Sequence, residues 1–162
     1  MAKINGIQIK NIKTFKDHEG CPIAQGTVYY KGKKLGEWSQ DSWGGPDIYR
    51  FDERILNEEL EKFKKSDLVD RRYREFTSLD SLLGAVINLA DDEKSFKRGV
   101  KKGYTALVLF DNGCTAEGYF CMGTKAEIRK SKNFADFCIG KSAEDIKKIR
   151  IYTCLEDFDI AV

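Results

Sequence analysis

The sequence predicts a small α+β protein, and three observations support this prediction. Polar and apolar residues alternate over much of residues 3–51, as they do in half-buried strands. Apolar residues recur at helical spacing within residues 53–65 and 78–102. Residues 104–110 (YTALVLF) form an almost continuous apolar run, which predicts a buried strand. The order of these segments predicts a small antiparallel sheet with one covering helix, joined to a second α+β part.

The first part begins with a strand predicted over residues 3–15, in which Asn5-Gly6 makes a turn or a bulge. Residues 23–30 and 35–40 predict a hairpin around KGKK, where Gly32 supplies the positive φ of a tight turn. A short strand over 48–51 follows, and Asp52 is placed to cap a helix over 53–65. The apolar face expected for that helix consists of Ile55, Leu56, Leu60 and Phe63.

The charged segment 66–76 (SDLVDRRYREF) is the expected seam between two modules. We therefore expect a β-rich module with one helix over residues 1–70 and a helix-hairpin-strand module over 71–162. An alternative is that both pack as a single domain.

In the second module a helix is expected from Ser78 until Asp91-Asp92 interrupts it. A shorter helix over 93–102 should then point Phe96 and Val100 inward. Residues 111–113 (DNG) predict the turn of a hairpin whose strands are 104–110 and 114–122. One helix or an edge strand is expected around 126–131, a short helix capped by Ser142 follows, and a final strand covers 149–155.

The composition excludes several classes of protein. The formal net charge of +2 on 162 residues does not predict strong non-specific attraction to nucleic acid or to an anionic membrane. No apolar run is long enough to span a bilayer, and the N-terminus lacks a secretory apolar core. We therefore expect a cytoplasmic protein without a membrane partner.

The cysteines are odd in number and scattered, and the chain has one histidine and no C-x-x-C pair. We expect small buried free thiols rather than a zinc site. The five cysteines are Cys21, Cys114, Cys121, Cys138 and Cys154.

Catalytic motifs for phosphate loops, nucleophile elbows, zinc proteases and dinucleotides do not occur in the sequence. The nearest candidate is a Cys–His couple, since Cys21 lies three residues after His18. Catalytic pairs usually come from separate elements, so an ordinary surface loop is the favoured interpretation. Asp41, Asp47 and Asp52 could hold Mg²⁺ or Ca²⁺, but their spacing does not match a calcium loop, and aspartate is common in turns and caps. We expect no metal and no cofactor.

Four short basic runs are separated along the chain, and each could touch phosphate groups. Tyr73 within RRYR adds a ring on which a base could stack. A solvated face is the favoured interpretation of any single run. The runs are KGKK at 31–34, KFKK at 62–65, RRYR at 71–74 and KRGVKK at 97–102.

Residues 25–51 combine both tryptophans with a basic turn and a Gly-Gly-Pro loop, and they are the expected contact surface. Tyrosine, tryptophan and arginine most often dominate binding energy, and glycines allow a close backbone approach. The competing interpretation is that Trp38 and Trp43 anchor a small module that is short of core. The expected partner-binding residues are Tyr30, Lys31, Lys33, Lys34, Trp38, Trp43, Gly44, Gly45 and Tyr49.

The stretch from Tyr29 to Gly45, with its G-K-K hairpin and G-G loop, resembles the N-terminal part of small uncharacterised proteins of bacterial phages and mobile elements. The Glu19-Gly20 pair is similar to an E-G pair in that group. The resemblance covers about the first 50 residues. It implies a mobile-element origin, and some such proteins are counter-defence inhibitors, anti-CRISPR proteins among them.

The function expected is therefore a non-enzymatic binding protein in the cytoplasm of a bacterial host. It would inhibit a host defence protein, or a protein–nucleic acid complex, by occupying its surface. Two alternatives remain open. One is direct binding of nucleic acid through RRYR and the basic helix ends, and the other is a small-ligand binder or enzyme at the Gly-Gly loop with Asp41 and Asp47.

Overall fold

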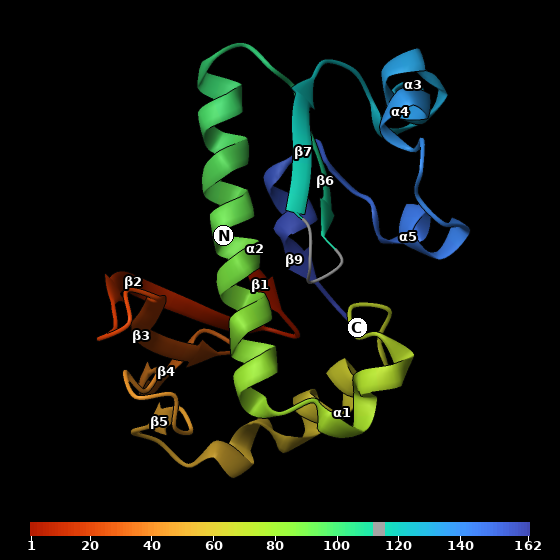
Figure 1. Ribbon diagram of the computed structural model, residues 1–162. Helices are drawn as coiled ribbons and strands as arrows, with labels where there is room; N and C mark the ends of the chain where they lie inside the picture. The colour runs from red at the N-terminus through yellow and green to blue at the C-terminus, as the bar shows by residue number, and fades with distance from the viewer. Residues whose placement is uncertain (112–115) are drawn as a thin grey trace. The chain divides into compact units, whose positions relative to one another are not determined.

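The α+β class is confirmed by a computed structural model that describes residues 1–111 and 116–162. The chain divides into two compact units, residues 1–90 with 159–162 and residues 91–158. Figure 1 shows both units and labels most of their helices and strands.

Unit 1 is built on a six-stranded sheet, here sheet A, with strand order β5-β4-β3-β2-β1-β9. All its pairings are antiparallel except that of β1 with β9, which is parallel. The expected antiparallel sheet is thus confirmed, and it gains a parallel edge strand from the end of the chain. The strands are β1 (Lys3–Ile4), β2 (Ile7–Lys16), β3 (Pro22–Tyr30), β4 (Lys33–Ser39), β5 (Ile48–Tyr49) and β9 (Asp159–Ile160).

Two tight turns shape sheet A, and both lie where the sequence predicts them. Asn5 and Gly6 have φ of 51° and 75°, so the expected first strand divides into β1 and β2. Lys31 and Gly32 have φ of 48° and 81°, as the two-residue turn between β3 and β4 requires.

A bulge in β2 is the third feature that bends sheet A. Asn11, with φ of 54°, and Ile12 together oppose the single residue Gly26 of β3. A Cβ on Gly26 would lie 2.5 Å from Cγ2 of Ile9, so only glycine allows this approach of the two strands.

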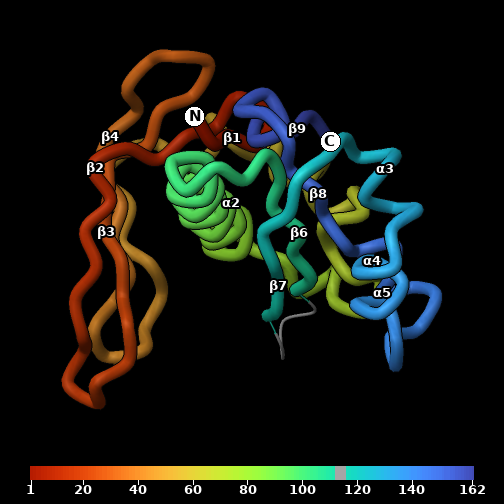
Figure 2. The backbone as a smooth tube through the Cα atoms, turned by 90° about the horizontal axis from the view of Figure 1, so that it is seen from above, coloured from red at the N-terminus to blue at the C-terminus, as the bar shows by residue number. Residues whose placement is uncertain are grey.

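The pleat gives sheet A two unlike faces, because directly paired residues point to the same side. The face that we call inner carries buried side chains, among them Ile9, Val28 and Trp38. Figure 2 shows α2 beside this sheet, with the opposite side of β2, β3 and β4 free of helices. That opposite side, here the outer face, consists of four rows of paired residues. The rows are Gln8-Tyr29-Lys34, Lys10-Thr27-Glu37, Lys13-Gln25-Ser39-Ile48 and Phe15-Ile23.

The helices of unit 1 supply the rest of its core. Asp52 accepts a hydrogen bond from the backbone N–H of Arg54, which confirms the predicted cap. Leu56 and Phe63 are buried as expected, whereas Ile55 is exposed because the first turn is a 3₁₀ helix and shifts the predicted face. Leu82, Leu83, Val86 and Leu89 are fully buried along the first half of α2. The helices are η1 (Glu53–Leu56), α1 (Asn57–Lys65), η2 (Arg71–Phe76) and the first half of α2 (Leu79–Lys101).

Unit 2 contains the second half of α2, a three-stranded sheet of order β7-β6-β8, and short helices. Its core gathers Val108 and Phe110 with side chains of α3 and α4, including Ile128 and Phe134. The expected hairpin is confirmed as β6 paired with β7, and Ser142 caps α5 as predicted. The turn expected at 111–113 lies largely outside the described residues. The elements are β6 (Ala106–Asp111), β7 (Ala116–Cys121), α3 (Lys125–Lys130), α4 (Lys132–Phe137), α5 (Ala143–Lys148), β8 (Arg150–Tyr152) and η3 (Leu155–Phe158).

Helix α2 differs most from the sequence-based expectation. It is continuous through Asp91-Asp92, because Asp91 pairs with Lys94 one turn on and Asp92 accepts a hydrogen bond from the hydroxyl of Tyr152. The units meet in sequence at residue 90 inside this helix, not at residue 70, because η2 attaches to α1 through Arg74, which donates to the carbonyl of Lys65. Val100, expected inside, is 49% exposed.

Across the residues described, no helix has the length and apolarity needed to cross a membrane.

We predict that Gly36→Ala lowers the free energy of unfolding of unit 1 by about 1–3 kcal/mol. A Cβ at Gly36 would lie 2.3 Å from the carbonyl oxygen of Arg50, so β4 must shift. Urea unfolding followed by tryptophan fluorescence reports on unit 1, which holds both tryptophans. The control is Gly84→Ala on α2, where a Cβ meets nothing within 4 Å and should add stability by up to about 1 kcal/mol. Equal effects of the two changes would contradict the crowding at Gly36.

Candidate binding surface

Two loops at one end of sheet A hold each other in place. We call residues 17–21, between β2 and β3, the His18 loop, and residues 40–47, between β4 and β5, the Trp43 loop. In the first, the Asp17 carboxylate accepts hydrogen bonds from the backbone N–H groups of Glu19 and Cys21. The second is tied to β3, since the Gln40 backbone N–H donates to the Ala24 carbonyl and the Gln40 side chain accepts from the Ala24 N–H. The His18 loop is therefore held by bonds within itself, and the Trp43 loop by bonds to β3.

Trp43 stands at the tip of this pair of loops and is 76% exposed. Its indole stacks on the imidazole of His18, with ring centroids 4.3 Å apart and planes 26° from parallel. Nδ1 of His18 lies 2.9 Å from the carbonyl oxygen of Ser42, which holds the imidazole in its place. The ring that the sequence predicts as an outward anchor is thus exposed on one face and supported on the other.

The two glycines beside Trp43 shape the loop rather than present a side chain. Gly44 has φ of 75°, in the left-handed region that favours glycine. The backbone N–H of Gly45 donates to the Asp41 carboxylate at 2.8 Å, and a Cβ there would lie 2.6 Å from that oxygen. Both expected site residues therefore set the position of Trp43.

Trp38 is not a contact residue, which corrects the sequence-based expectation. It lies on the inner face of sheet A and is 1% exposed. Its indole N–H donates to the Asp47 carboxylate at 2.7 Å. Burial raises the pKa of Asp47, and this hydrogen bond partly opposes the rise. For Trp38 the competing interpretation, a core anchor, is the right one.

Tyr30 and Tyr49 also point to the inner face. The Tyr49 hydroxyl donates to Asp80 of α2, and burial together with this carboxylate raises the pKa of Tyr49. The Tyr30 hydroxyl donates to the buried Glu59 of α1 at 2.8 Å. Both tyrosines thus hold helices against the sheet.

The three lysines of the KGKK turn lie at the other end of the β3–β4 hairpin from Trp43. All three are exposed, and Nζ of Lys31 lies 4.7 Å from the centroid of the Tyr30 ring. The seven residues of β4 separate Lys33 from the Trp43 loop by roughly 20 Å. The structure therefore does not gather the expected residues into one site.

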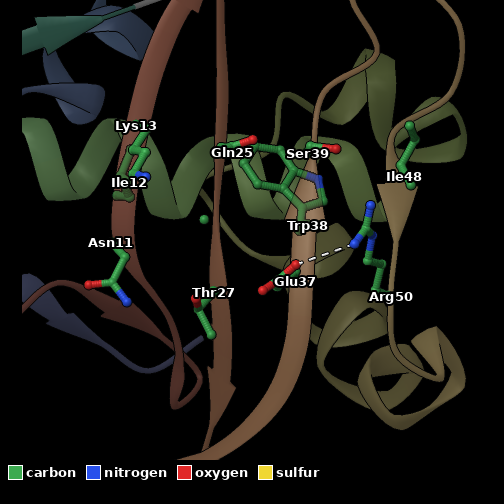
Figure 3. A pocket seen from close by; sticks show the side chains of 11 residues that line it. Asn11, Ile12, Lys13, Gln25, Thr27, Glu37, Trp38, Ser39, Ile48 and Arg50 are labelled. Atoms are coloured by element: carbon green, nitrogen blue, oxygen red, sulfur yellow. Dashed lines mark ion pairs between the residues drawn. The ribbon is translucent and has the colours of Figure 1, made fainter.

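An open groove of about 560 Å³ runs across the outer face of sheet A, and Figure 3 looks into it with the helices behind the strands. Lys13 and Arg50 bring positive charge to it, and Arg50 Nη1 lies 3.6 Å from a carboxylate oxygen of Glu37. Sequence reasoning missed this groove, because it arises where the bulge of β2 meets Gly26. Its other lining residues include Asn11, Gln25, Thr27, Ser39 and Ile48.

The residues that the sequence offers for catalysis or metal binding have structural roles or do not come together. Nε2 of His18 lies 3.7 Å from Glu19, so both ring nitrogens already have neighbours other than the thiol of Cys21. Asp52 caps η1. Within the described segments, His, Cys, Asp and Glu side chains form no group of three that could hold a metal ion.

The cysteines are less buried than expected. Cys21 and Cys154 are exposed, while Cys121 and Cys138 are half-buried against the core of unit 2. Cys114 lies outside the described residues. The thiols are free where the structure describes them.

The basic runs do not share one role. In KFKK, Lys62 pairs with Glu59 and Lys64 pairs with Glu61. In RRYR, Tyr73 is 59% exposed beside the guanidinium of Arg72, which binds Asp70. In KRGVKK, Lys97 pairs with Glu93.

Comparison with known proteins gives no relative from which a role could be transferred. No protein-family model, no curated protein and no solved structure matches this chain.

We predict that the two tryptophans differ strongly in what they contribute to stability. Trp38→Ala should lower the free energy of unfolding by about 3–5 kcal/mol, since it opens a cavity and leaves Asp47 without its donor. Trp43→Ala should change it by less than about 1 kcal/mol, because most of that ring is already in water. Urea unfolding followed by circular dichroism measures both. A loss of several kcal/mol in the free energy of unfolding of Trp43→Ala would contradict the prediction, since it would mean that the ring is part of the core.

We predict a pH-dependent loss of stability for Glu59→Gln. Burial alone would raise the pKa of Glu59, but the hydrogen bonds from Tyr30 and Lys62 outweigh it and hold the pKa below the usual 4.5. Its stabilising contribution is therefore complete at pH 7 and is lost as the pH falls below 4.5 and through the lower pKa of the folded state. Urea unfolding should show that Glu59→Gln lowers the free energy of unfolding by about 1–2 kcal/mol at pH 7. The difference from the unmodified chain should be smaller at pH 3.5. The exposed Glu58→Gln is the control and should show neither effect.

Proposed function

We propose that this chain is a non-enzymatic binding protein that recognises a macromolecular partner through Trp43. The observation that supports the proposal is an indole 76% exposed yet held by a stacked imidazole and two bonded loops. A ring fixed before binding loses little conformational entropy when a partner covers it. Tryptophan is also the residue type most enriched among the anchors of interfaces.

The surroundings of Trp43 suit a contact surface. Phe15 and Ile48 are 44% and 49% exposed at the same end of sheet A. Large apolar side chains gathered at one exposed end favour contact with another molecule. The polar groups of the two loops are bonded within them, so they can hold the shape of the surface when a partner covers it.

A binding role fits the loops better than catalysis does. A nucleophile needs a base within hydrogen-bonding reach. His18 instead contacts Ser42, Trp43 and Glu19. Asp41 and Asp47, the acids expected at the Gly-Gly loop, bind Gly45 and Trp38. We therefore propose that these groups maintain the surface.

The partner that we propose is a defence protein of a bacterial host, or its complex with nucleic acid. This proposal depends on the resemblance of residues 29–45 to proteins of phages and mobile elements. The inhibitor would act in the bacterial cytoplasm, and it would act sterically, by covering a surface that the partner needs.

Site-specific photo-crosslinking in a bacterial host tests the proposal. We expect p-benzoylphenylalanine at Trp43 to give a discrete adduct of one partner. The matched control is the same group at Phe76, an aromatic residue of η2 that is 81% exposed. Trp43→Ala should reduce, at least tenfold, the amount of the crosslinked protein that co-purifies with the chain. Phe76→Ala should leave that amount unchanged. Adducts from both positions alike, or none from Trp43, would contradict the proposal.

A further inference from the structure

The outer face of sheet A carries an excess of positive charge. Its four rows contain Lys10, Lys13 and Lys34, and Arg50 extends the face from β5. Against these four cations the rows hold one acid, Glu37. Since the whole chain carries a formal charge of only +2, this excess is a local property of the face. An anionic ligand is the charge-complementary occupant.

The groove on this face offers neutral hydrogen-bonding groups between the cations. Asn11 and Gln25 each present an amide with both donors and an acceptor, and Thr27 adds a hydroxyl. Figure 3 shows the amide of Asn11 and the side chains of Gln25 and Thr27 on three sides of the groove, with Lys13 and Arg50 at its margins. Such groups match the edges of nucleobases, which also mix donors with acceptors.

Aromatic rings lie at both ends of the rows. Phe15, in the last row, is 44% exposed. Tyr29, in the first row, lies under Lys10, whose Nζ is 4.4 Å from the ring centroid. The rows between them extend for roughly 20 Å along β2. Rings combined with a basic groove are the features by which proteins hold single-stranded nucleic acid.

An acidic peptide is the main competing occupant, and the backbone of β2 argues against it. A peptide that docks on a sheet usually adds a strand at a free edge, and β2 has such an edge beyond Ile7. The bulge at Asn11 and Ile12 interrupts the row of backbone groups along that edge. A duplex is also a poor fit, because it is read by a helix or a narrow ribbon that enters its groove.

We infer that the outer face of sheet A binds single-stranded nucleic acid, with Lys13 and Arg50 on phosphates and Phe15 stacked on a base. This inference does not depend on the proposed function. Phe15 borders both surfaces, but Lys13 and Arg50 are not part of the Trp43 surface, and the test needs no protein partner.

The test is fluorescence anisotropy of a labelled 12-nucleotide oligo-deoxythymidine with the full chain at 50–300 mM salt. We expect binding that weakens as salt rises. Replacing both cations (Lys13→Gln with Arg50→Gln) should weaken it at least tenfold and make the slope of log affinity against log salt shallower by about 1.4. Phe15→Ala should weaken it roughly fivefold or more. Glu37→Gln should strengthen it, since it removes the acid of the face.

The matched control removes the same charge elsewhere in unit 1. Lys65→Gln with Arg71→Gln changes two exposed cations at the end of α1 and in η2, and it should alter the affinity less than twofold. Circular dichroism verifies that every variant is folded. No binding at 50 mM salt, or equal losses in the two double variants, would overturn the inference. It would also fail if a duplex of the same length, or a 12-residue polyglutamate, bound as tightly as the single strand.

Discussion

The alternation of side chains along β3 and β4 decides which residues of unit 1 can meet a partner. Neighbouring residues point to opposite faces, and helices cover only one of them. Trp38 fills the covered side, where its burial and its bond to Asp47 fasten β4 to the segment that follows. A shift of one residue in register would bring Glu37 into the core and Trp38 into water, so the hydrophobic effect fixes the register firmly. The positions of the Trp43 loop and of the outer rows follow from that one register.

The alternation of side chains along the strands also gives unit 1 two kinds of surface. The end of the sheet presents apolar rings on bonded loops, which suits a partner whose shape matches them. The outer face presents cations and amides on a pleated surface, which suits a flexible anionic chain. A protein that carries both could bind a protein–nucleic acid complex more tightly than either component alone, because the second contact forms within the same complex.

Sequence patterns predicted the alternation but not which face is covered. The alternation places Val28, Tyr30, Gly36 and Trp38 on one side, which agrees with their pairing in the structure. Both sides hold aromatic residues, and the acceptors of the Tyr49 and Tyr30 hydroxyls, Asp80 and Glu59, lie about 30 residues away, where local patterns do not reveal them. The groove was missed because it needs a left-handed Asn11, and asparagine gives only a weak signal of that conformation. The turns were predictable, since Asn-Gly and Lys-Gly mark them locally.

The parallel pair of β1 and β9 joins residues that are far apart in the chain. The backbone N–H of Val162 donates to the Asn5 side chain across 157 positions, and the Asn5 N–H donates to the Ile160 carbonyl. Unit 2 is therefore an insertion within unit 1, between Ala90 in the middle of α2 and β9. During synthesis on the ribosome, β1 cannot pair with β9 until unit 2 has been translated. Such distant closure slows folding, so the local β1–β2 and β2–β3 pairs should form first and the pairing of β1 with β9 last.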